Sequence, residues 1–377
     1  MPTTDETTAA ATAAATAVRT GRLEAPGATL HYEVRGRGPL LVMVPGGSAD
    51  AGIYDALAAG LADRWTVVAF DPRGYSRSTL HGPTGEQLPG THSEDVARLI
   101  ELLSPDGAPA AVFGSSSSAI VALDLLSRRP GLVGRVVAHE PPLVELLPDP
   151  AAGRAVFAAV RESFLRDGVE AAMATMAAGL APAGGAGGGR YEVATGADEE
   201  SRAATGPVED GGATAPPQES GGASEAEAEA EAQNGAGAGA EVDAVTEAEA
   251  KATAAAAAEA TARAGAGAGA GAGAKVGAVA EAEAATVRRM MANLPVFLGH
   301  VLCSFSGHAP DLDALRAAAP KLVVGVGRES RALLPAVAAE RLAQRVGSVT
   351  AEFPGGHVGL TEDPVAFGAR LREVLLG

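Results

Sequence analysis

The sequence predicts an α/β protein built on a mostly parallel, doubly wound sheet with a helical cap. Continuous apolar runs of strand length alternate with segments of helical periodicity, which is the pattern of repeated βα units. This alternation stops after residue 138 and resumes at residue 322. A run of four serines, residues 115–118, stands at one expected strand-to-helix turn. Together these observations predict one sheet whose two sequence halves are separated by a long insertion.

The strands expected before the interruption are continuously apolar rather than alternating, which is typical of strands covered on both faces. The predicted strands of this half are residues 40–44, 67–70, 110–113 and 136–138, and its predicted helices are residues 52–62, 93–104 and 117–129. Upstream, residues 22–24 and 29–35 predict an antiparallel pair joined around Pro26 and Gly27.

The second half completes the same sheet. Residues 322–326 and 348–353 predict strands, with a helix over residues 334–345 between them. A last helix that ends at Leu376 is expected to begin at Pro364, because Asp363 is a good N-cap and proline is favoured at the first helical position.

The middle of the chain has low-complexity composition. Glu-Ala repeats occupy residues 225–232, and Gly-Ala alternates over residues 264–274. Large apolar side chains are scarce there, so little burial offsets the entropy of ordering, and disorder is predicted. The Gly-Ala block is not expected to be helical, because glycine costs about 1 kcal/mol per helical position relative to alanine.

The flanks of this region carry apolar residues at helical spacing and predict helices that form a cap. The predicted segments are a disordered tail at 1–20, the first part of the core at 21–145, cap helices at 146–181, a disordered insert at 182–285, further cap helices at 286–319 and the second part of the core at 320–377.

The net charge of −17 is concentrated in the insert. Residues 191–285 hold 18 acidic and 4 basic side chains, a balance of 4 − 18 = −14, so the rest of the chain is nearly neutral. A nucleic-acid partner is not expected, since such surfaces are basic. The N-terminal segment lacks the charge and apolar run of a secretory signal, and no apolar run is long enough to predict a membrane span, so a cytoplasmic location is expected.

Metal and cofactor sites are not predicted. Cys303 is the only cysteine, which excludes an intrachain disulfide or a cluster of thiolate ligands. The histidines show no paired spacing with other metal ligands. The expected partner is a small-molecule acyl substrate, and the sequence does not indicate the oligomeric state.

The serine run predicts a nucleophile. A serine held on a strained strand-to-helix turn exposes its Oγ above the sheet, and Ser116 stands two residues after Gly114, as such a turn requires. Ser118 stands where a second glycine is usual. The alternative is that these serines only cap the helix, because their oxygens accept its unpaired N–H groups. Ser115 and Ser117 are the other candidate nucleophiles.

An activated serine also needs a base and a carboxylate that orients the base. His357 follows the strand at 348–353, and Glu329 follows the strand at 322–326, so both are expected at carboxyl ends, where catalytic groups of open α/β sheets gather. Glu329 is the preferred acid by position. Rival acids remain: Glu140, which follows the strand at 136–138, and Asp311 and Asp313.

Two further motifs complete a resemblance. Residues 44–48, Val-Pro-Gly-Gly-Ser, resemble an oxyanion loop, and residues 71–78, Asp-Pro-Arg-Gly-Tyr-Ser-Arg-Ser, resemble a D-x-R-G-x-G-x-S turn. With the serine turn and the order Ser, acid, His, the chain resembles the α/β-hydrolase fold superfamily over residues 20–180 and 286–377. The resemblance implies that the backbone N–H groups of Gly47 and Ser117 bind the oxyanion. Pro45 and Ser76 depart from the histidine and glycine usual in these two motifs.

The expected activity is hydrolysis of a carboxylic ester, lactone or thioester through an acyl-enzyme. The resemblance leaves open carbon–carbon bond hydrolysis, acyl transfer, aminopeptidase action and perhydrolysis, and also a ligand-binding protein without turnover. A serine nucleophile argues against the dehalogenase and epoxide hydrolase branches, which carry aspartate there. The residues expected to line the substrate pocket under the cap are Phe157, Met290, Met291, Phe297 and Leu298.

Overall fold

The structure is a computed structural model that describes residues 17–104, 106–180 and 270–377, with the backbone alone described for residues 270–279. A nine-stranded sheet runs in the order β1-β2-β4-β3-β6-β7-β8-β9, and β5 pairs with β2. The strands are β1 (Arg19–Ala25), β2 (Ala28–Arg35), β3 (Leu40–Val44), β4 (Thr66–Phe70), β5 (Thr79–Leu80), β6 (Ala110–Ser115), β7 (Val133–His139), β8 (Leu322–Gly327) and β9 (Val349–Phe353). The six strands from β4 to β9 along this order are parallel, and β2 pairs antiparallel with β1, β4 and β5.

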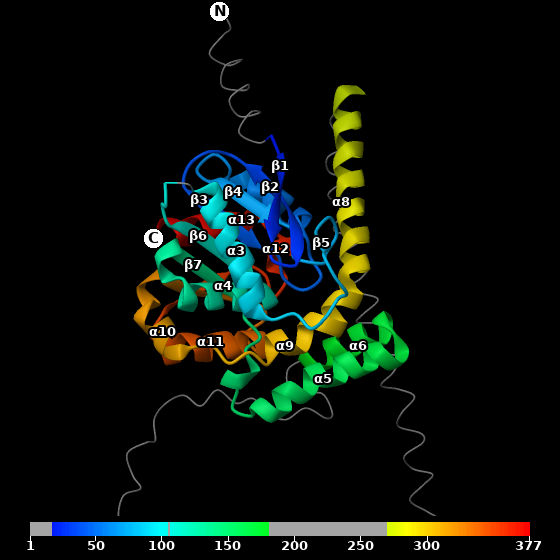
Figure 1. The fold of residues 1–377 in the computed structure, drawn as a ribbon, viewed down its shortest axis with the longest axis vertical. Coiled ribbons are helices and arrows are strands. Elements are labelled where there is room, and N and C mark those ends of the chain that lie inside the picture. Colours follow the sequence, from blue (N-terminus) through cyan, green and yellow to red (C-terminus); the bar gives the residue numbers. More distant parts are fainter. Residues whose placement is uncertain (1–16, 105, 181–269) are drawn as a thin grey trace, which may run out of the picture.

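Helices cover both faces of this sheet (Figure 1). The helices of the core are α2 (Asp55–Leu61), α3 (Pro89–Leu103), α4 (Ser117–Arg128), α11 (Leu334–Val346), α12 (Gly359–Glu362) and α13 (Pro364–Leu376). Neighbouring residues of one strand enter different apolar clusters: Val112 of β6 packs in the cluster of α3, α4 and α11, whereas Phe113 packs in the cluster of α2 and α13. Burial on both faces explains why these strands are continuously apolar in sequence. The predicted mostly parallel, doubly wound sheet is confirmed.

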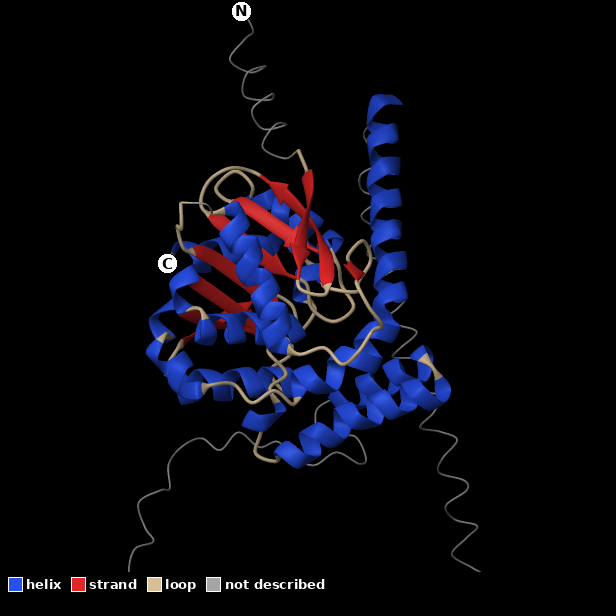
Figure 2. Cartoon of the chain, viewed as in Figure 1, coloured by secondary structure: helices blue, strands red, loops and turns tan. Residues whose placement is uncertain are grey.

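In the described residues the cap is helical: part of it lies at one end of the core, and one long helix runs along the side of the core (Figure 2). Its elements are α5 (Pro150–Asp167), α6 (Val169–Leu180), α8 (Ala270–Val296), the π-helical turn η4 (Phe297–Val301), α9 (Leu302–Ser306) and α10 (Leu312–Ala317). Pro295 lies inside α8 and cannot donate a backbone hydrogen bond, which accounts for the π-helical turn that follows and for the change of direction from α8 into α9. This bend brings the end of α8 against the core.

Two predicted boundaries are wrong. Residues 181–269, most of the predicted insert, lie outside the described residues, but residues 270–285 belong to α8, including residues 270–274 of the Gly-Ala block. Once the alanine-rich segment that follows has formed a helix, further residues add to it without a new nucleation cost, and this outweighs the glycine penalty. The predicted tail lies outside the described residues up to residue 16, whereas Arg19 and Thr20 pair with β2 as part of β1.

Short elements were also missed. The strand β5 is only two residues long, too short for its apolar pattern to be recognised, and it pairs with Ala28 and Thr29 of β2.

Within the described ranges, no helix has both the length and the hydropathy that crossing a bilayer requires.

Candidate active site

The turn from β6 into α4 holds Ser116 at a positive φ of 59°, with ψ −130°. Its N–H donates to the carbonyl of His139 at 2.9 Å, which anchors the turn to β7. Gly114 is required on this turn, because a Cβ there would lie 2.4 Å from the carbonyl oxygen of Ser118. In the described part of the chain, the Ser116 hydroxyl makes no capping bond to α4, so the simple capping interpretation does not hold for this residue.

Ser118 stabilises the turn in place of the expected glycine. Its Oγ donates to the carbonyl of Ser115 at 2.8 Å and accepts the N–H of the same residue at 2.9 Å. The added Cβ is therefore accommodated, and the hydroxyl closes the turn onto itself.

The Ser116 hydroxyl lies beside the imidazole of His357, which in turn lies beside the carboxylate of Glu140. His357, in the loop after β9, has its Nε2 3.1 Å from Ser116 Oγ, and its Nδ1 lies 2.7 Å from Oε2 of Glu140. Glu140 follows β7 and is fully buried, whereas the His357 side chain keeps 18% exposure. Burial alone would raise the pKa of Glu140, but hydrogen bonds from His357 and Ser330 and the charge of nearby imidazoles hold this pKa below its usual value. An ionised carboxylate favours the imidazole tautomer that carries its proton on Nδ1.

The second oxygen of Glu140 is held by the loop after β8. The N–H of Gly327 donates to Oε1 at 2.7 Å, and the hydroxyl of Ser330 donates to the same oxygen. Ser330 is buried, at 1% exposure. Both carboxylate oxygens thus have donors, and the carboxylate is fixed against His357.

The prediction that Glu329 pairs with His357 is wrong. Glu329 is exposed, and the bond it makes at this site is from its backbone N–H to the carbonyl of Gly355, at 3.1 Å. Of the rival acids, Asp311 caps α10 and Asp313 pairs with Arg316, both on the exposed surface. Glu140 is the carboxylate beside the histidine. Its strand, β7, lies between β6 and β8, and the φ of 47° at Glu140 turns the chain sharply after this strand.

The predicted oxyanion loop packs directly on the serine turn. A Cβ on Gly46 would lie 2.2 Å from the carbonyl oxygen of Ser115, so this approach requires glycine. Gly47 has φ 58°, and its N–H donates to Oγ of Ser117 at 2.8 Å. The N–H of Ser117 is in the first turn of α4, where helix geometry supplies no partner. Gly47 and Ser117 are therefore brought together beside Ser116.

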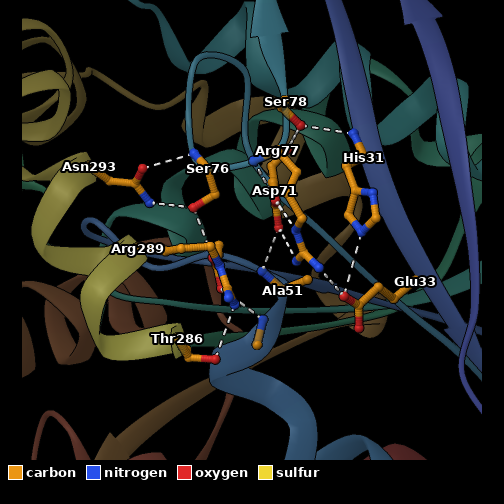
Figure 3. A network of polar contacts seen from close by, with 12 residues as sticks. His31, Glu33, Ala51, Asp71, Ser76, Arg77, Ser78, Thr286, Arg289 and Asn293 are labelled. Carbon is orange, nitrogen blue, oxygen red and sulfur yellow. Dashed lines mark hydrogen bonds and ion pairs between the residues drawn. The ribbon is translucent and has the colours of Figure 1, made fainter. Parts of the chain in front are cut away.

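The turn that begins at Asp71 stabilises the chain next to the predicted oxyanion loop. Asp71 is fully buried and accepts two bonds from the Arg77 guanidinium, at 2.7 and 2.8 Å, one from the Arg77 N–H at 2.9 Å and one from the N–H of Ala51 at 3.1 Å (Figure 3). Arg73 pairs with Asp95 through two bonds of 2.8 and 2.6 Å. These motif residues hold this part of the core in place.

The five predicted pocket residues separate into two groups. Phe157, Phe297 and Leu298 are buried in the apolar cluster that joins the cap to the core, and Met290 is half-buried. Met291 is 58% exposed, so its predicted place in a pocket lining is wrong. It lies on a face of α8 that turns away from the core.

Comparison with known proteins agrees with this architecture. The family model described as "alpha/beta hydrolase fold" matches residues 39–178. An uncharacterized hydrolase of Bacillus subtilis, YraK, is 44% identical over 130 residues, which are 34% of this chain and 47% of the relative. The 2-(acetamidomethylene)succinate hydrolase of Mesorhizobium japonicum is 30% identical over 117 residues, 31% of this chain and 41% of the relative. The chain thus matches less than half the length of each relative.

Similarity in structure extends over nearly the whole chain. A thermophilic esterase from Thermogutta terrifontis superposes with a TM-score of 0.56 at 17% identity, covering 95% of this chain and 98% of the esterase. An identity this low speaks for the fold alone. Taken with the sheet order and the serine turn, these similarities show that the chain has the α/β-hydrolase fold.

Proposed function

We propose that the protein is a serine hydrolase that acts on a small or medium acyl substrate, a carboxylic ester, lactone or thioester, through an acyl-enzyme. One observation carries the proposal: Ser116 Oγ, His357 and Glu140 form a continuous chain of contacts of 3.1 and 2.7 Å at the carboxyl ends of β6, β9 and β7. Nucleophile, base and orienting carboxylate are the three parts that such chemistry needs.

In the first step, Ser116 Oγ attacks the acyl carbon while His357 Nε2 takes the hydroxyl proton. The bond to the leaving group then breaks, and His357 returns the proton to that group. In the second step a water gives its proton to His357 and attacks the acyl carbon. The bond between this carbon and Ser116 Oγ then breaks, His357 returns the proton to Oγ, and the acid leaves. Glu140 stays ionised throughout and stabilises the imidazolium that forms in each step.

Negative charge develops on the acyl oxygen in both steps. The N–H groups of Gly47 and Ser117 are the proposed donors for this oxygen. In the free protein the Ser117 hydroxyl accepts the Gly47 N–H. In the reaction the substrate oxygen replaces Ser117 Oγ as the acceptor of the Gly47 N–H, which requires no more than rotation of the Ser117 side chain.

The substrate class is supported by chemistry and by similarity of fold. The Thermogutta terrifontis protein of the same fold is an esterase. The Mesorhizobium japonicum relative is named for hydrolysis of 2-(acetamidomethylene)succinate, so other acyl bonds stay alternatives to an ester. The complete hydrogen-bond chain favours turnover over ligand binding alone. A cytoplasmic location and a lining formed by Phe157, Phe297, Leu298 and Met290 stay predictions.

A panel of chromogenic esters, thioesters and lactones tests this proposal on the full chain. The wild-type protein should turn over at least one of them, and Ser116→Ala should lower kcat by several orders of magnitude, because members of a triad act as a unit. Ser127→Ala, a serine near the other end of α4, is the matched control and should retain turnover. Undiminished turnover by Ser116→Ala would refute the assignment.

A further inference from the structure

We infer that Asn293, together with Arg289, is a positioning residue: through these two side chains, α8 holds the loop that presents the Gly47 N–H to the reacting oxygen. The inference rests on the proposed function, because it gives Gly47 its role as an oxyanion donor. It concerns a contact between the cap and the core that is remote in sequence, since α8 follows the loop by more than two hundred residues.

Asn293 bonds to both segments that flank the site. Its Nδ2 donates to Oγ of Ser76 and its Oδ1 accepts the N–H of Ser76, each at 2.9 Å (Figure 3). The same Nδ2 also donates to the carbonyl of Ser48 at 2.9 Å. The Asn293 side chain is buried, at 3% exposure. Ser48 directly follows Gly47, so the bond to its carbonyl fixes the chain next to the proposed donor.

Arg289 fixes the other end of the same loop. Its Nε donates to Oδ2 of Asp50, and its Nη2 donates to Oδ1 at 3.2 Å. Asp50 is fully buried and also accepts the N–H of Gly52 at 2.9 Å, which caps the short helix η1 (Ala51–Tyr54). Hydrogen bonds from Arg289 and Ser76 hold the pKa of Asp50 below its usual value, although burial alone would raise it. The loop between Gly47 and Asp50 is therefore held by α8 on both sides.

Ser76 links the two contacts and departs from the glycine usual in its motif. Its φ is 47°, a conformation that favours glycine, so its side chain is retained against a backbone cost. The hydroxyl donates to Asp50 Oδ2 at 2.8 Å and accepts from Asn293. A glycine could supply the N–H to Asn293 but not the hydroxyl between Asn293 and Asp50. The unusual serine and the two α8 side chains thus form one network.

This network has a kinetic consequence. Removing an oxyanion donor outright costs about 10²–10³ in kcat, because the donor acts on charge that develops in the transition state. Loss of Asn293 leaves the Gly47 N–H present but its loop unfixed, so we expect a smaller loss, of about 10-fold or more. The initial binding of the reagent should change little, since the loop acts on the transition state.

The test compares Asn293→Ala and Arg289→Ala with Arg288→Ala. Arg288 is the neighbouring arginine on α8, and it pairs with Glu281 on the exposed surface, so it is a matched control. A fluorophosphonate supplies the chemical readout, with the maximal rate of Ser116 labelling measured separately from the concentration that gives half this rate. Hydrogen exchange of peptides that span residues 45–52, and the Tm, supply the structural readouts.

We expect Asn293→Ala and Arg289→Ala to lower the maximal labelling rate about 10-fold or more, with the half-rate concentration unchanged and faster exchange confined to residues 45–52. Arg288→Ala should match the wild-type protein in all three. Unchanged labelling in a folded Asn293→Ala protein would overturn the inference, and so would faster exchange spread over the whole core. If Asn293→Ala does not fold, Asn293→Asp keeps the side-chain size and the acceptor for Ser76 but removes the donor to Ser48, and the same criteria apply.

Failure of the proposed function gives a different result. A wild-type protein that fluorophosphonate does not label at Ser116 would contradict the hydrolase mechanism. The exchange measurement needs no catalysis, so localised exchange at residues 45–52 in the two variants would still support the contact between α8 and the loop, and its absence would refute it.

Discussion

Glu140 Oε2 lies 2.7 Å from Nδ1 of His357, so the carboxylate that orients this histidine comes from the end of β7 and not from the end of β8. The loop after β8 contributes instead the N–H of Gly327 and the hydroxyl of Ser330, which hold the other carboxylate oxygen. The segments after β7 and β8 thus both contribute: the first supplies the carboxylate, and the second fixes its orientation.

This arrangement predicts opposite results for two conservative substitutions. Glu140→Gln should lower kcat by about 10²–10⁴, because a neutral amide no longer stabilises the imidazolium or its productive tautomer. Glu329→Gln is the matched control and should leave kcat near the wild-type value, since Glu329 is exposed. Steady-state kinetics on the best ester of the panel make the comparison, and a larger loss in Glu329→Gln would reverse the assignment of the acid.

Ser330→Ala should raise the pKa of Glu140, because it removes a hydrogen bond to the charged form. A carboxyl whose pKa is lower in the folded than in the unfolded protein stabilises the fold above its ordinary pKa, here 4.5, and this stabilisation is lost as the pH falls through the folded pKa. Ser330→Ala should therefore show a smaller fall of Tm below pH 4.5 than the wild-type protein, because less of this stabilisation is left to lose. An equally steep fall of Tm in the two proteins would show that Ser330 does not act on the pKa of Glu140.

Protonation of His139 should destabilise the protein at a higher pH than protonation of Glu140 does. Burial lowers the pKa of His139 to about 4, and the ring packs against Phe353 and Phe367 while its Nδ1 contacts Ser115 Oγ at 2.9 Å. A histidine with a lowered folded pKa stabilises the fold above 6.5, and this stabilisation is lost as the pH falls from 6.5 towards 4. His139→Phe should thus reduce the fall of Tm over this range, and an equally steep fall would contradict the assignment.

Gly114→Ala should prevent the serine turn from forming. The new Cβ would lie 2.4 Å from the backbone oxygen of Ser118, so strand and helix must separate, at a cost of about 3 kcal/mol or more. Gly131→Ala, where a Cβ has nothing within 4 Å, is the matched control. Urea unfolding monitored by circular dichroism measures both, and similar free energies of unfolding for the two variants would show that the turn tolerates a wider approach.

The sheet and two of the three residues at the site could be predicted from sequence because their signals are local. Apolar runs of strand length indicate buried strands wherever they pack, and Ser116 and His357 each follow such a run within a short loop. The choice between Glu140 and Glu329 is not local. Both follow strands, and what decides between them is which strand lies beside β6 and the positive φ at Glu140.

The contact between the cap and the core could not be predicted from local sequence signals either. The apolar character of α8 indicates a helix, but Met291 is exposed while Asn293 is buried, because the core contacts α8 through polar residues there. A pattern that ranks faces by hydrophobicity cannot identify a face that binds through an asparagine and an arginine.

The most direct test of the proposed triad is to locate the covalent adduct formed by a fluorophosphonate on the full chain, by mass spectrometry of its peptides. We expect one adduct, on Ser116, that disappears in Ser116→Ala and forms far more slowly in Glu140→Gln. An adduct on Ser115 or Ser117, or labelling that persists in Ser116→Ala, would contradict the proposed mechanism.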